Sequence, residues 1–145
     1  MNIVCQLVKF GSKEQVESIE LRRKVLRVPL GLDFSKEELA LEGHQFHFVA
    51  AGFGKIVGVL ILVAHPNGIL KMRQVAVDSE IQNQGIGQQL VEFSEKWAIN
   101  NTYNLMVLNA RKAAVPFYLK LNYQVTSTEF MEVGIAHVTM QKNLF

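Results

Sequence analysis

The chain has 145 residues, of which 49% are hydrophobic and 19% charged, the size and composition of one folded domain, and this excludes a disordered chain. Its 15 basic and 13 acidic residues leave a formal net charge of +2, so no strong positive field for nucleic acid is expected. The single cysteine, Cys5, excludes an intrachain disulfide and a thiolate-rich zinc site. We therefore expect residues 1–145 to form a single domain with no nucleic-acid partner.

The apolar segments do not predict a membrane protein or an exported one. The longest apolar run, Ile56 to Ala64, is much shorter than the roughly 20 residues that a membrane helix needs. Gln6 and Lys9 interrupt the apolar stretch at the N-terminus, which argues against a secretory signal. With one cysteine and no anchor, we expect a cytoplasmic protein with no membrane partner.

The first elements are a short strand and a helix. Residues Ile3 to Val8 predict the strand, and Ser12 with Gln15 has the spacing of a helix capping box. Three residues predict the apolar face of this helix: Val16, Ile19 and Leu26. Pro29 and Gly31 are expected to end this helix.

A basic cluster lies on the same helix and consists of Arg22, Arg23, Lys24 and Arg27. We expect it to be a solvated face, with the aliphatic stems covering apolar surface; a role facing the substrate is the alternative. A second short helix is expected from Ser35, its N-cap, to Glu42.

A series of strands follows. The β-branched and aromatic stretches His47–Ala51 and Lys55–Ala64 predict an antiparallel pair. Asn67 and Gly68 predict the next tight turn, because both tolerate a positive φ. The strand Ile69–Val77 comes after this turn and runs directly into a loop that contains glycine.

The second half of the chain continues with a helix whose apolar residues are spaced for one buried face: Ile86, Leu90, Phe93 and Trp97. A strand at 105–108 and a helix at 113–121 are expected next. Residues 123–130 and 135–141 predict a closing hairpin around Gly134. This order predicts an α/β fold, with a mixed sheet covered by helices on both faces.

The loop before the long helix is the strongest candidate for a binding site. A helix N-terminus carries unpaired N–H groups and a partial positive charge, so Gly85 and Gly87 at this position favour a phosphate site. A tight turn between strand and helix is the alternative. A Walker A loop is excluded because Gln88 and Gln89 follow Gly87, and the dinucleotide fingerprint is excluded because Leu90 occupies the position of its third glycine.

The loop Gln82-Asn83-Gln84-Gly85-Ile86-Gly87, which follows the strand Gln74–Asp78, resembles the Q/R-x-x-G-x-G/A pyrophosphate loop of the GNAT superfamily of N-acetyltransferases. Downstream, Leu108–Arg111, Ala114–Tyr118 and Leu121–Tyr123 resemble the second cofactor segment of that family. The tail from Glu129 to His137 resembles the subgroup of bacterial ElaA-like proteins. The resemblance covers nearly the whole chain and is strongest from Met72 onward.

The resemblance implies a GNAT-type α/β fold whose mixed, mostly antiparallel central sheet is splayed at the cofactor site, with helices on both faces. It implies an N-acetyltransferase that moves an acetyl group from acetyl-CoA directly to a primary amine of a small molecule or peptide. Acetyl-CoA is then the cosubstrate, and no metal is implied.

The resemblance also implies roles for individual residues. The pyrophosphate would be held by the amides of Gln82, Asn83, Gln84, Gly85, Ile86 and Gly87, with Gln88. Main-chain groups of Val75, Ala76 and Val77 would bind the pantetheine arm as an added strand does. The side chain of Asn109 would contact the arm, and Phe117 with Tyr118 would complete the cofactor site.

Tyr118 is the expected catalytic residue, as the proton donor to the leaving CoA thiolate. A main-chain N–H near Val75 would stabilise the tetrahedral oxyanion. The alternative for Tyr118 is an ordinary helix residue whose hydroxyl contacts water.

The general base stays unassigned. Many relatives carry Glu where this chain has Gln74, which cannot act as a base. Glu129, Glu132 and His137 are candidates, and none is chosen. The missing Glu supports an alternative function, a non-catalytic acyl-CoA-binding module.

The remaining candidates carry less chemistry. His44 and His47, three apart on an expected strand, would point to opposite faces, so no metal site is predicted. Trp97 and the phenylalanines are expected in the core. The closing hairpin offers a sheet edge that could pair with a second copy in a homodimer. The acceptor amine is not specified by any motif.

Overall fold

The computed structural model describes residues 2–145. Contacts within the chain divide it into two compact units, the first up to Val63 together with Gln74–Ser94, the second Ala64–Arg73 together with Glu95–Phe145. Strands β3 (Lys55–His65) and β4 (Ile69–Val77) and helix α3 (Ile86–Asn100) each contribute residues to both units.

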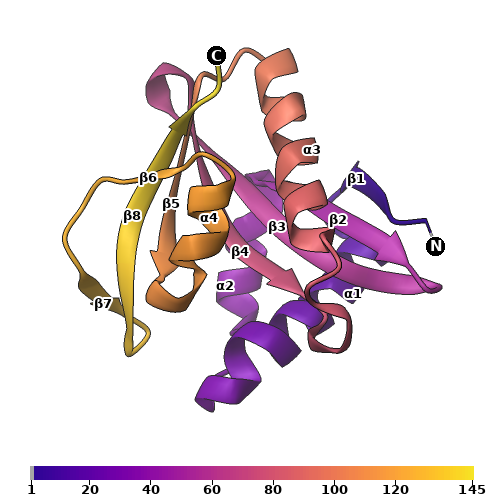
Figure 1. Cartoon of the computed structure of the whole chain (residues 1–145). Helices are drawn as coiled ribbons and strands as arrows, with labels where there is room; N and C mark the ends of the chain where they lie inside the picture. Colours follow the sequence, from indigo (N-terminus) through magenta and orange to yellow (C-terminus); the bar gives the residue numbers. More distant parts are fainter. Residues whose placement is uncertain (1) are drawn as a thin grey trace. The chain divides into compact units, whose positions relative to one another are not determined.

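The first unit begins with strand β1 and helix α1 and ends in α3 (Figure 1). The elements that lie wholly within it are, in chain order, β1 (Val4–Val8), α1 (Lys13–Arg22), the π-helical turn η1 (Arg23–Arg27), the 3-10 turn η2 (Val28–Leu30), α2 (Lys36–Ala40), η3 (Leu41–His44), β2 (Phe46–Gly52) and η5 (Ser79–Ile81), and most of β3 also belongs to it. The expected strands and both expected N-caps, Ser12 and Ser35, are present.

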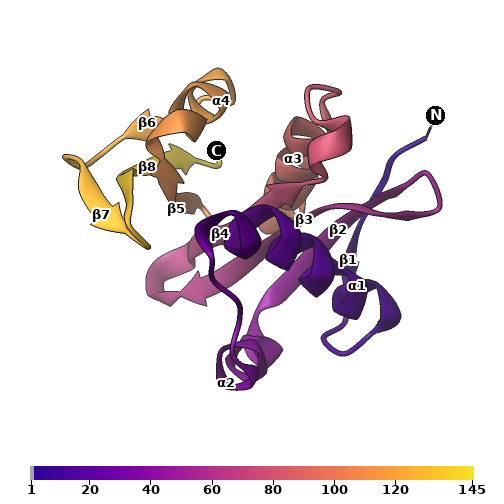
Figure 2. The same cartoon turned by 90° about the horizontal axis from the view of Figure 1, so that it is seen from below.

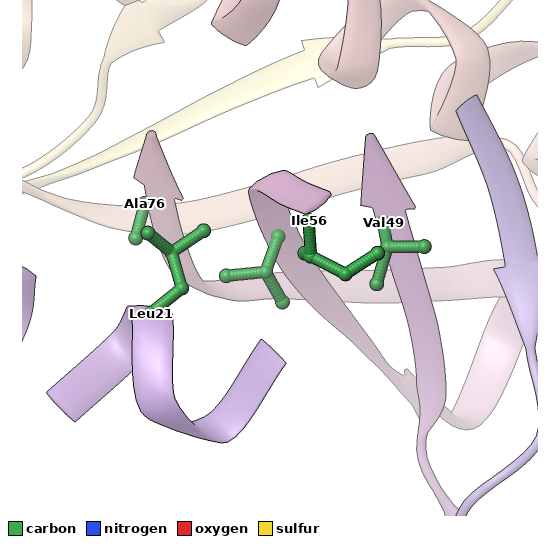
Figure 3. Close-up of a cluster of buried hydrophobic side chains, with 5 residues drawn as sticks. Leu21, Val49, Ile56 and Ala76 are labelled. Carbon is green, nitrogen blue, oxygen red and sulfur yellow. The ribbon is translucent and has the colours of Figure 1, made fainter. Parts of the chain in front are cut away.

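Strands β1, β2 and β3 form an antiparallel meander with a helix on each face. Val49 pairs with Val59 and Ala50 with Gly58, and since side chains alternate along a strand these two pairs face opposite sides. Val49 and Val59 pack with Leu21 of α1, Ile56 and Ala76 in the buried cluster of Figure 3. A Cβ added at Gly58 would lie 3.3 Å from Ile86 and 3.4 Å from Leu90 of α3. Figure 2 shows α1 and α3 on opposite sides of these strands.

The expected apolar face of the first helix is wrong for Val16 and confirmed for Leu26, which packs against the buried cluster. Val16 is 52% exposed, whereas Gln15, Ser18 and Leu21 are buried on the opposite side of the helix. Ser12 Oγ accepts from Gln15 N–H, and Gln15 Oε1 accepts in turn from Gly11 N–H. The apolar pattern mispredicted Val16 because the inward positions of α1 are partly occupied by polar residues that bond to the local main chain.

The residues of the basic cluster differ in burial, and the expectation of a solvated face is wrong for Arg22. Arg22 is fully buried against Glu42, whereas Arg23 is an outer residue that binds Glu20 and Asp33. Lys24 is half exposed. Spacing along the sequence could not separate these residues, because Arg22 follows Leu21 directly on the inward side of the helix.

The second unit contains a parallel and several antiparallel strand pairs. Its remaining elements are η4 (Pro66–Gly68), β5 (Leu105–Arg111), η6 (Lys112–Ala114), α4 (Val115–Lys120), β6 (Gln124–Val125), β7 (Phe130–Glu132) and β8 (Ile135–Asn143). Residues Ile69–Met72 of β4 pair in parallel with Leu105–Leu108 of β5, and β5 pairs antiparallel with β8. Asn67 has a φ of 69°, as the turn prediction requires.

The closing hairpin is more broken than expected. Instead of one strand over 123–130, two short strands, β6 and β7, pair with different parts of β8. Strand β8 therefore has partners on both sides, β5 on one and these two strands on the other, and is not a free edge. The homodimer stays a prediction.

These pairings make a mixed α/β fold with an open, mostly antiparallel sheet and helices, which confirms the expected fold class. Both units derive from one continuous chain, and the single-domain organisation stays a prediction. In residues 2–145 we find no helix long and apolar enough to cross a membrane.

The turn between β7 and β8 contains an unusual residue. Glu132 pairs with Ile135, so Val133 and Gly134 form a two-residue loop, with φ values of 45° and 75°. Left-handed φ angles suit Asn-Gly in this turn, whereas a β-branched residue at φ above zero is strained. Val133→Asn should therefore raise stability by about 1 kcal/mol, or roughly 2–4 °C in the midpoint of thermal unfolding.

Val133→Ala is the matched control for this change. Alanine removes the branched side chain but keeps the Cβ penalty at positive φ, so it should stabilise less than asparagine. Equal midpoints for the two variants in a calorimetric scan would contradict the strain at Val133.

Candidate functional site

Asp78 fixes the point where the chain leaves β4 and enters the glycine loop. Its N–H donates to Val57 O at 2.9 Å, and its carboxylate accepts from Glu80 N–H at 3.0 Å and lies 3.1 Å from Lys55 Nζ. The Glu80 N–H, together with the Lys55 ammonium, holds the pKa of this buried carboxyl below its usual range. The side chain of Asp78 thus anchors the start of the loop, a role that the sequence did not predict.

The loop leads into α3 with its first main-chain N–H groups free. Asn83 and Gly85 have φ values of 69° and 77°, and Gly85 O accepts the helix bond from Gln89 N–H at 2.9 Å. Within residues 2–145, the N–H groups of Ile86, Gly87 and Gln88 make no hydrogen bond. A helix start with free donors and a partial positive charge fits a phosphate group.

Packing within the first unit holds this helix start in place. Ile86 is 2% exposed and Leu90 is fully buried, and both approach Gly58 of β3, where any side chain would push them away. Gln89 Nε2 also donates to Ile3 O at 3.1 Å. The apolar side of α3 is therefore anchored, while Gln82, Asn83, Gln84 and Gly85 are exposed.

The segment expected to bind the pantetheine arm lies just before this loop. Ala76 points into the buried cluster, whereas Val75 and Val77 are half-buried. The side chain of Gln82 donates from Nε2 to Val77 O at 3.2 Å. Of the main-chain groups expected to bind the cofactor, the Val77 carbonyl is therefore engaged by the loop itself.

The other expected site residues lie in the second unit. Tyr118 of α4 is 6% exposed, with its ring 5.0 Å from that of Phe117 and 5.6 Å from that of Tyr123. Its hydroxyl makes no hydrogen bond to any residue from 2 to 145. Burial raises the pKa of Tyr118 well above its usual range, so the phenol keeps its proton at neutral pH.

The neighbouring phenol is committed to another partner. Tyr123 donates to Glu95 Oε2 at 2.7 Å, and Lys142 Nζ lies 2.9 Å from Glu95 Oε1. The pKa of Tyr123 is raised mainly by burial and further by the negative charge of Glu95. Of these two tyrosines, Tyr118 is thus the one whose hydroxyl is available to a ligand.

Asn109 lies in a polar cluster with two of the three general-base candidates. Its Oδ1 accepts from Thr139 at 3.1 Å and its Nδ2 donates to Glu132 Oε2 at 3.5 Å. His137 Nε2 lies 3.8 Å from the same carboxylate oxygen, and His137 Nδ1 lies 2.7 Å from Ile135 O. Because a carbonyl only accepts, Nδ1 carries the proton, and Nε2 can accept one beside a carboxylate.

The third candidate base is placed differently. Glu129 forms an ion pair with Lys112 at 3.4 Å, and both side chains are largely exposed. The first unit contains Val75–Val77 and Gln82–Gln88, and the second contains Asn109, Phe117 and Tyr118. Within residues 2–145, no group of three or more His, Cys, Asp or Glu side chains is arranged to hold a metal ion.

The sequence analysis also missed a buried charged group beside β4. Arg22 and Glu42 bind one another, and Arg22 also binds Gln74. The sequence of α1 does indicate this buried pair, because Gln15, Ser18 and Arg22 are spaced by three and four residues and therefore lie on one face of the helix. A polar stripe at this spacing indicates a buried polar interaction as readily as a solvated surface.

Comparisons with known proteins bear on this arrangement. The model of the acetyltransferase (GNAT) domain family matches residues 28–144. A Bacillus subtilis protein named as an acetyltransferase is 31% identical over 140 residues, which cover 92% of this chain and 93% of that protein. YjcF of Bacillus subtilis, named as an N-acetyltransferase, is 35% identical over 78 residues, 53% of this chain and only 56% of YjcF.

Crystal structures extend the likeness in fold. A Lactobacillus plantarum protein named as an N-acetyltransferase has a TM-score of 0.87 at 19% identity, covering 99% of both chains. ElaA of Escherichia coli has a TM-score of 0.81 at 18% identity, covering 97% of this chain and 99% of ElaA. A GNAT acetyltransferase of Elizabethkingia anophelis, solved with acetyl-CoA bound, has a TM-score of 0.76 at 20% identity, covering 98% of both chains.

The lowered pKa of Asp78 makes a pH-dependent prediction. Because its folded pKa lies below the unfolded value of about 3.9, its stabilisation is present above that pH and is lost as pH falls. Asp78→Asn keeps an oxygen for Glu80 N–H but removes the charge that faces Lys55. The variant should unfold at a lower temperature than the native chain at pH 7, by an amount that shrinks between about pH 5 and 3.

Thermal unfolding followed by circular dichroism measures this difference. Glu80→Gln, which removes a neighbouring exposed charge, is the control and should give a small difference at both pH values. A deficit of Asp78→Asn that stays constant with pH would show that the carboxylate charge contributes nothing.

Proposed function

The chain belongs to the GNAT family and is an acetyltransferase, and on this premise we propose that it transfers the acetyl group of acetyl-CoA directly to a primary amine of a small molecule or peptide. The observation that carries the proposal is the free N–H groups of Ile86, Gly87 and Gln88 at the start of α3. They supply the donors and the positive helix end that a pyrophosphate requires. The exposed loop residues 82–85 leave room for such an anion.

Binding of the rest of acetyl-CoA is proposed to rest on main-chain contacts. Val75 and Ala76 lie in an extended strand and would pair with the amides of the pantetheine arm. Asn109, whose side chain is hydrogen-bonded to Thr139 and Glu132, would contact the arm through its amide. In the transfer step, the amine attacks the thioester carbonyl, and a main-chain N–H near Val75 would stabilise the oxyanion.

The collapse of this tetrahedral intermediate breaks the carbon–sulfur bond, and the sulfur leaves as a thiolate. We assign Tyr118 as the group that donates a proton to it, and the proton that the attacking nitrogen loses would restore the phenol. Support comes from a hydroxyl that no described residue binds, on a side chain that is otherwise buried, and from the raised pKa that keeps this phenol protonated. Tyr123 is a poor alternative because its hydroxyl already donates a hydrogen bond to Glu95.

A direct test measures CoA thiol release from acetyl-CoA with polyamines, amino acids and peptides that have free N-termini. Thiol release with at least one amine, in step with acetylated product, is the expected result. Binding of acetyl-CoA with no thiol release for any amine would instead favour the non-catalytic acyl-CoA-binding module.

The helix start provides the first prediction on this function. Acetyl-CoA at about 100 times its Kd should stabilise the folded chain by about 2.7 kcal/mol, a shift of several degrees in thermal unfolding. Gly85→Glu should abolish the shift, because the new carboxylate would stand beside the phosphate and repel it. A Cβ at position 85 meets no atom within 4 Å, so the side chain itself has space.

The matched control is Gly85→Asn. Asparagine tolerates the φ of 77° better than other residues and adds no charge, so it should keep a measurable part of the acetyl-CoA shift. If Gly85→Glu shifts as much as the native chain, the pyrophosphate lies elsewhere.

Tyr118 provides the second prediction. Tyr118→Phe should lower kcat by about 100-fold, the usual effect of losing a general acid, while the KM for acetyl-CoA changes little. Because burial raises the pKa of Tyr118, the phenol stays protonated, and the ratio of native to variant kcat should be constant between about pH 6 and 9.

Tyr123→Phe is the control that removes a hydroxyl from the adjacent ring. It breaks the bond to Glu95 and should lower the unfolding temperature while leaving kcat within about threefold. Steady-state kinetics that show equal losses of kcat for the two variants would remove Tyr118 from the mechanism.

A further inference from the structure

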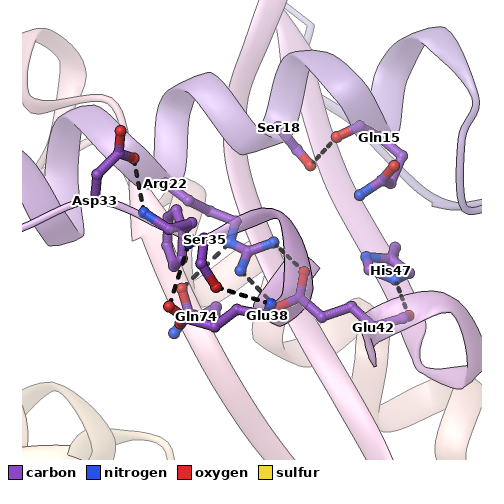
Figure 4. A network of polar contacts seen from close by, with 10 residues as sticks. Gln15, Ser18, Arg22, Asp33, Ser35, Glu38, Glu42, His47 and Gln74 are labelled. Atoms are coloured by element: carbon purple, nitrogen blue, oxygen red, sulfur yellow. Dashed lines mark hydrogen bonds and ion pairs between the residues drawn. The ribbon is translucent and has the colours of Figure 1, made fainter. Parts of the chain in front are cut away.

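Arg22, the last residue of α1, is a fully buried charge. Its Nη1 and Nη2 donate to Glu42 Oε1 and Oε2 at 2.8 and 2.7 Å, and the two side chains are 0% and 3% exposed (Figure 4). A buried ion pair gains little net stability, because desolvation of both charges offsets their attraction, and apolar residues of similar volume often serve as well. Stability alone therefore does not account for this pair.

The guanidinium has further contacts that connect separate segments. Its Nε donates to Gln74 Oε1 of β4 at 3.2 Å, and its Cζ lies 4.6 Å from the ring centre of Phe34, which precedes α2. Glu42 is itself fixed, since its main-chain oxygen lies 2.8 Å from His47 Nε2. Figure 4 shows Arg22 among Glu42, Gln74 and the α2 region. The guanidinium is thus held in one position.

The position of Arg22 also determines how the Gln74 amide is turned. Arginine has only donors, so the amide oxygen of Gln74 must face it. Gln74 has a φ of 56° inside a strand, which is uncommon for a residue with a Cβ. Such conformations persist only where the surroundings hold them, and they concentrate at functional positions.

This strained residue immediately precedes the segment proposed to bind acetyl-CoA. The φ and ψ of Gln74 set the direction of the following N–H, that of Val75. The following inference rests on the proposed function. We propose that Arg22, held by Glu42, is a positioning residue. It keeps the backbone of Gln74 left-handed and thereby points the Val75 N–H at the acyl oxygen. Arg22 acts through Gln74 and does not touch the reacting atoms.

The test removes the ion pair without leaving a lone buried charge. Arg22→Met with Glu42→Met keeps the side-chain volume, so the double variant should fold with an unfolding temperature close to the native one. The kcat should fall roughly tenfold to a hundredfold, as when one oxyanion donor is misplaced, while the KM for acetyl-CoA changes less. A native kcat in the folded double variant would overturn the proposal.

A rescue separates positioning from a general loss of structure. Glycine adopts a left-handed φ without any side chain, whereas alanine does not. Adding Gln74→Gly to the double variant should therefore restore at least part of kcat, and adding Gln74→Ala should not. Equal kcat values for these two triple variants would overturn the proposal.

If the double variant fails to fold, the same contrast applies in the otherwise native chain. Gln74→Gly should then retain a higher kcat than Gln74→Ala, because only glycine keeps the left-handed φ without a Cβ; equal values again overturn the proposal. A crystal structure of a folded Arg22→Met, Glu42→Met variant gives a readout without turnover. A negative φ at Gln74 supports the proposal, and an unchanged positive φ overturns it.

Failure of the proposed function is distinguishable from failure of this inference. The former shows in the unmodified protein, as no release of CoA thiol with any amine. The latter shows as transfer by the unmodified protein that the double variant leaves unchanged, or as an unchanged φ at residue 74.

Discussion

The site depends on the main-chain N–H groups in the first turn of α3, which have no hydrogen-bond partner in the described chain. Every α-helix begins with N–H groups that have no partner within the helix, and most proteins cap them with a side chain. Here Asp78 caps the turn before the loop, and the N–H groups of Ile86, Gly87 and Gln88 remain free. Packing of Leu90 against β3 holds the helix and thereby keeps these donors in place.

Much of this arrangement could be predicted from the sequence because local rules determine it. Strand β4 has the expected bounds, Asn67 and Gly68 form the expected turn, and Ser35 begins α2 with a full capping box. Each of these depends on residues within a few positions of one another. The glycine loop was found for the same reason, since strand, loop and helix start are contiguous in the chain.

What could not be predicted depends on contacts between distant residues. Arg22 is buried because Glu42 and Gln74, 20 and 52 residues away, satisfy its donors, and helix periodicity contains no information on either. Residues 123–130 were expected to pair as one strand, but β8 bonds to β6 and β7 separately. For Arg22, the prediction from the hydrophobic pattern failed because its polar groups find their partners only in the folded chain.

The burial of Tyr118 raises a chemical question about its role, because a phenol with a raised pKa is a weaker acid. Desolvation acts on both partners of the proton transfer, however. An apolar environment that disfavours phenolate disfavours the CoA thiolate for the same reason, so the affinity of both groups for the proton rises together. The difference in pKa between donor and acceptor, rather than either value alone, sets the driving force. In the proposed mechanism, burial would therefore keep Tyr118 protonated before the transfer without removing its ability to donate a proton during it.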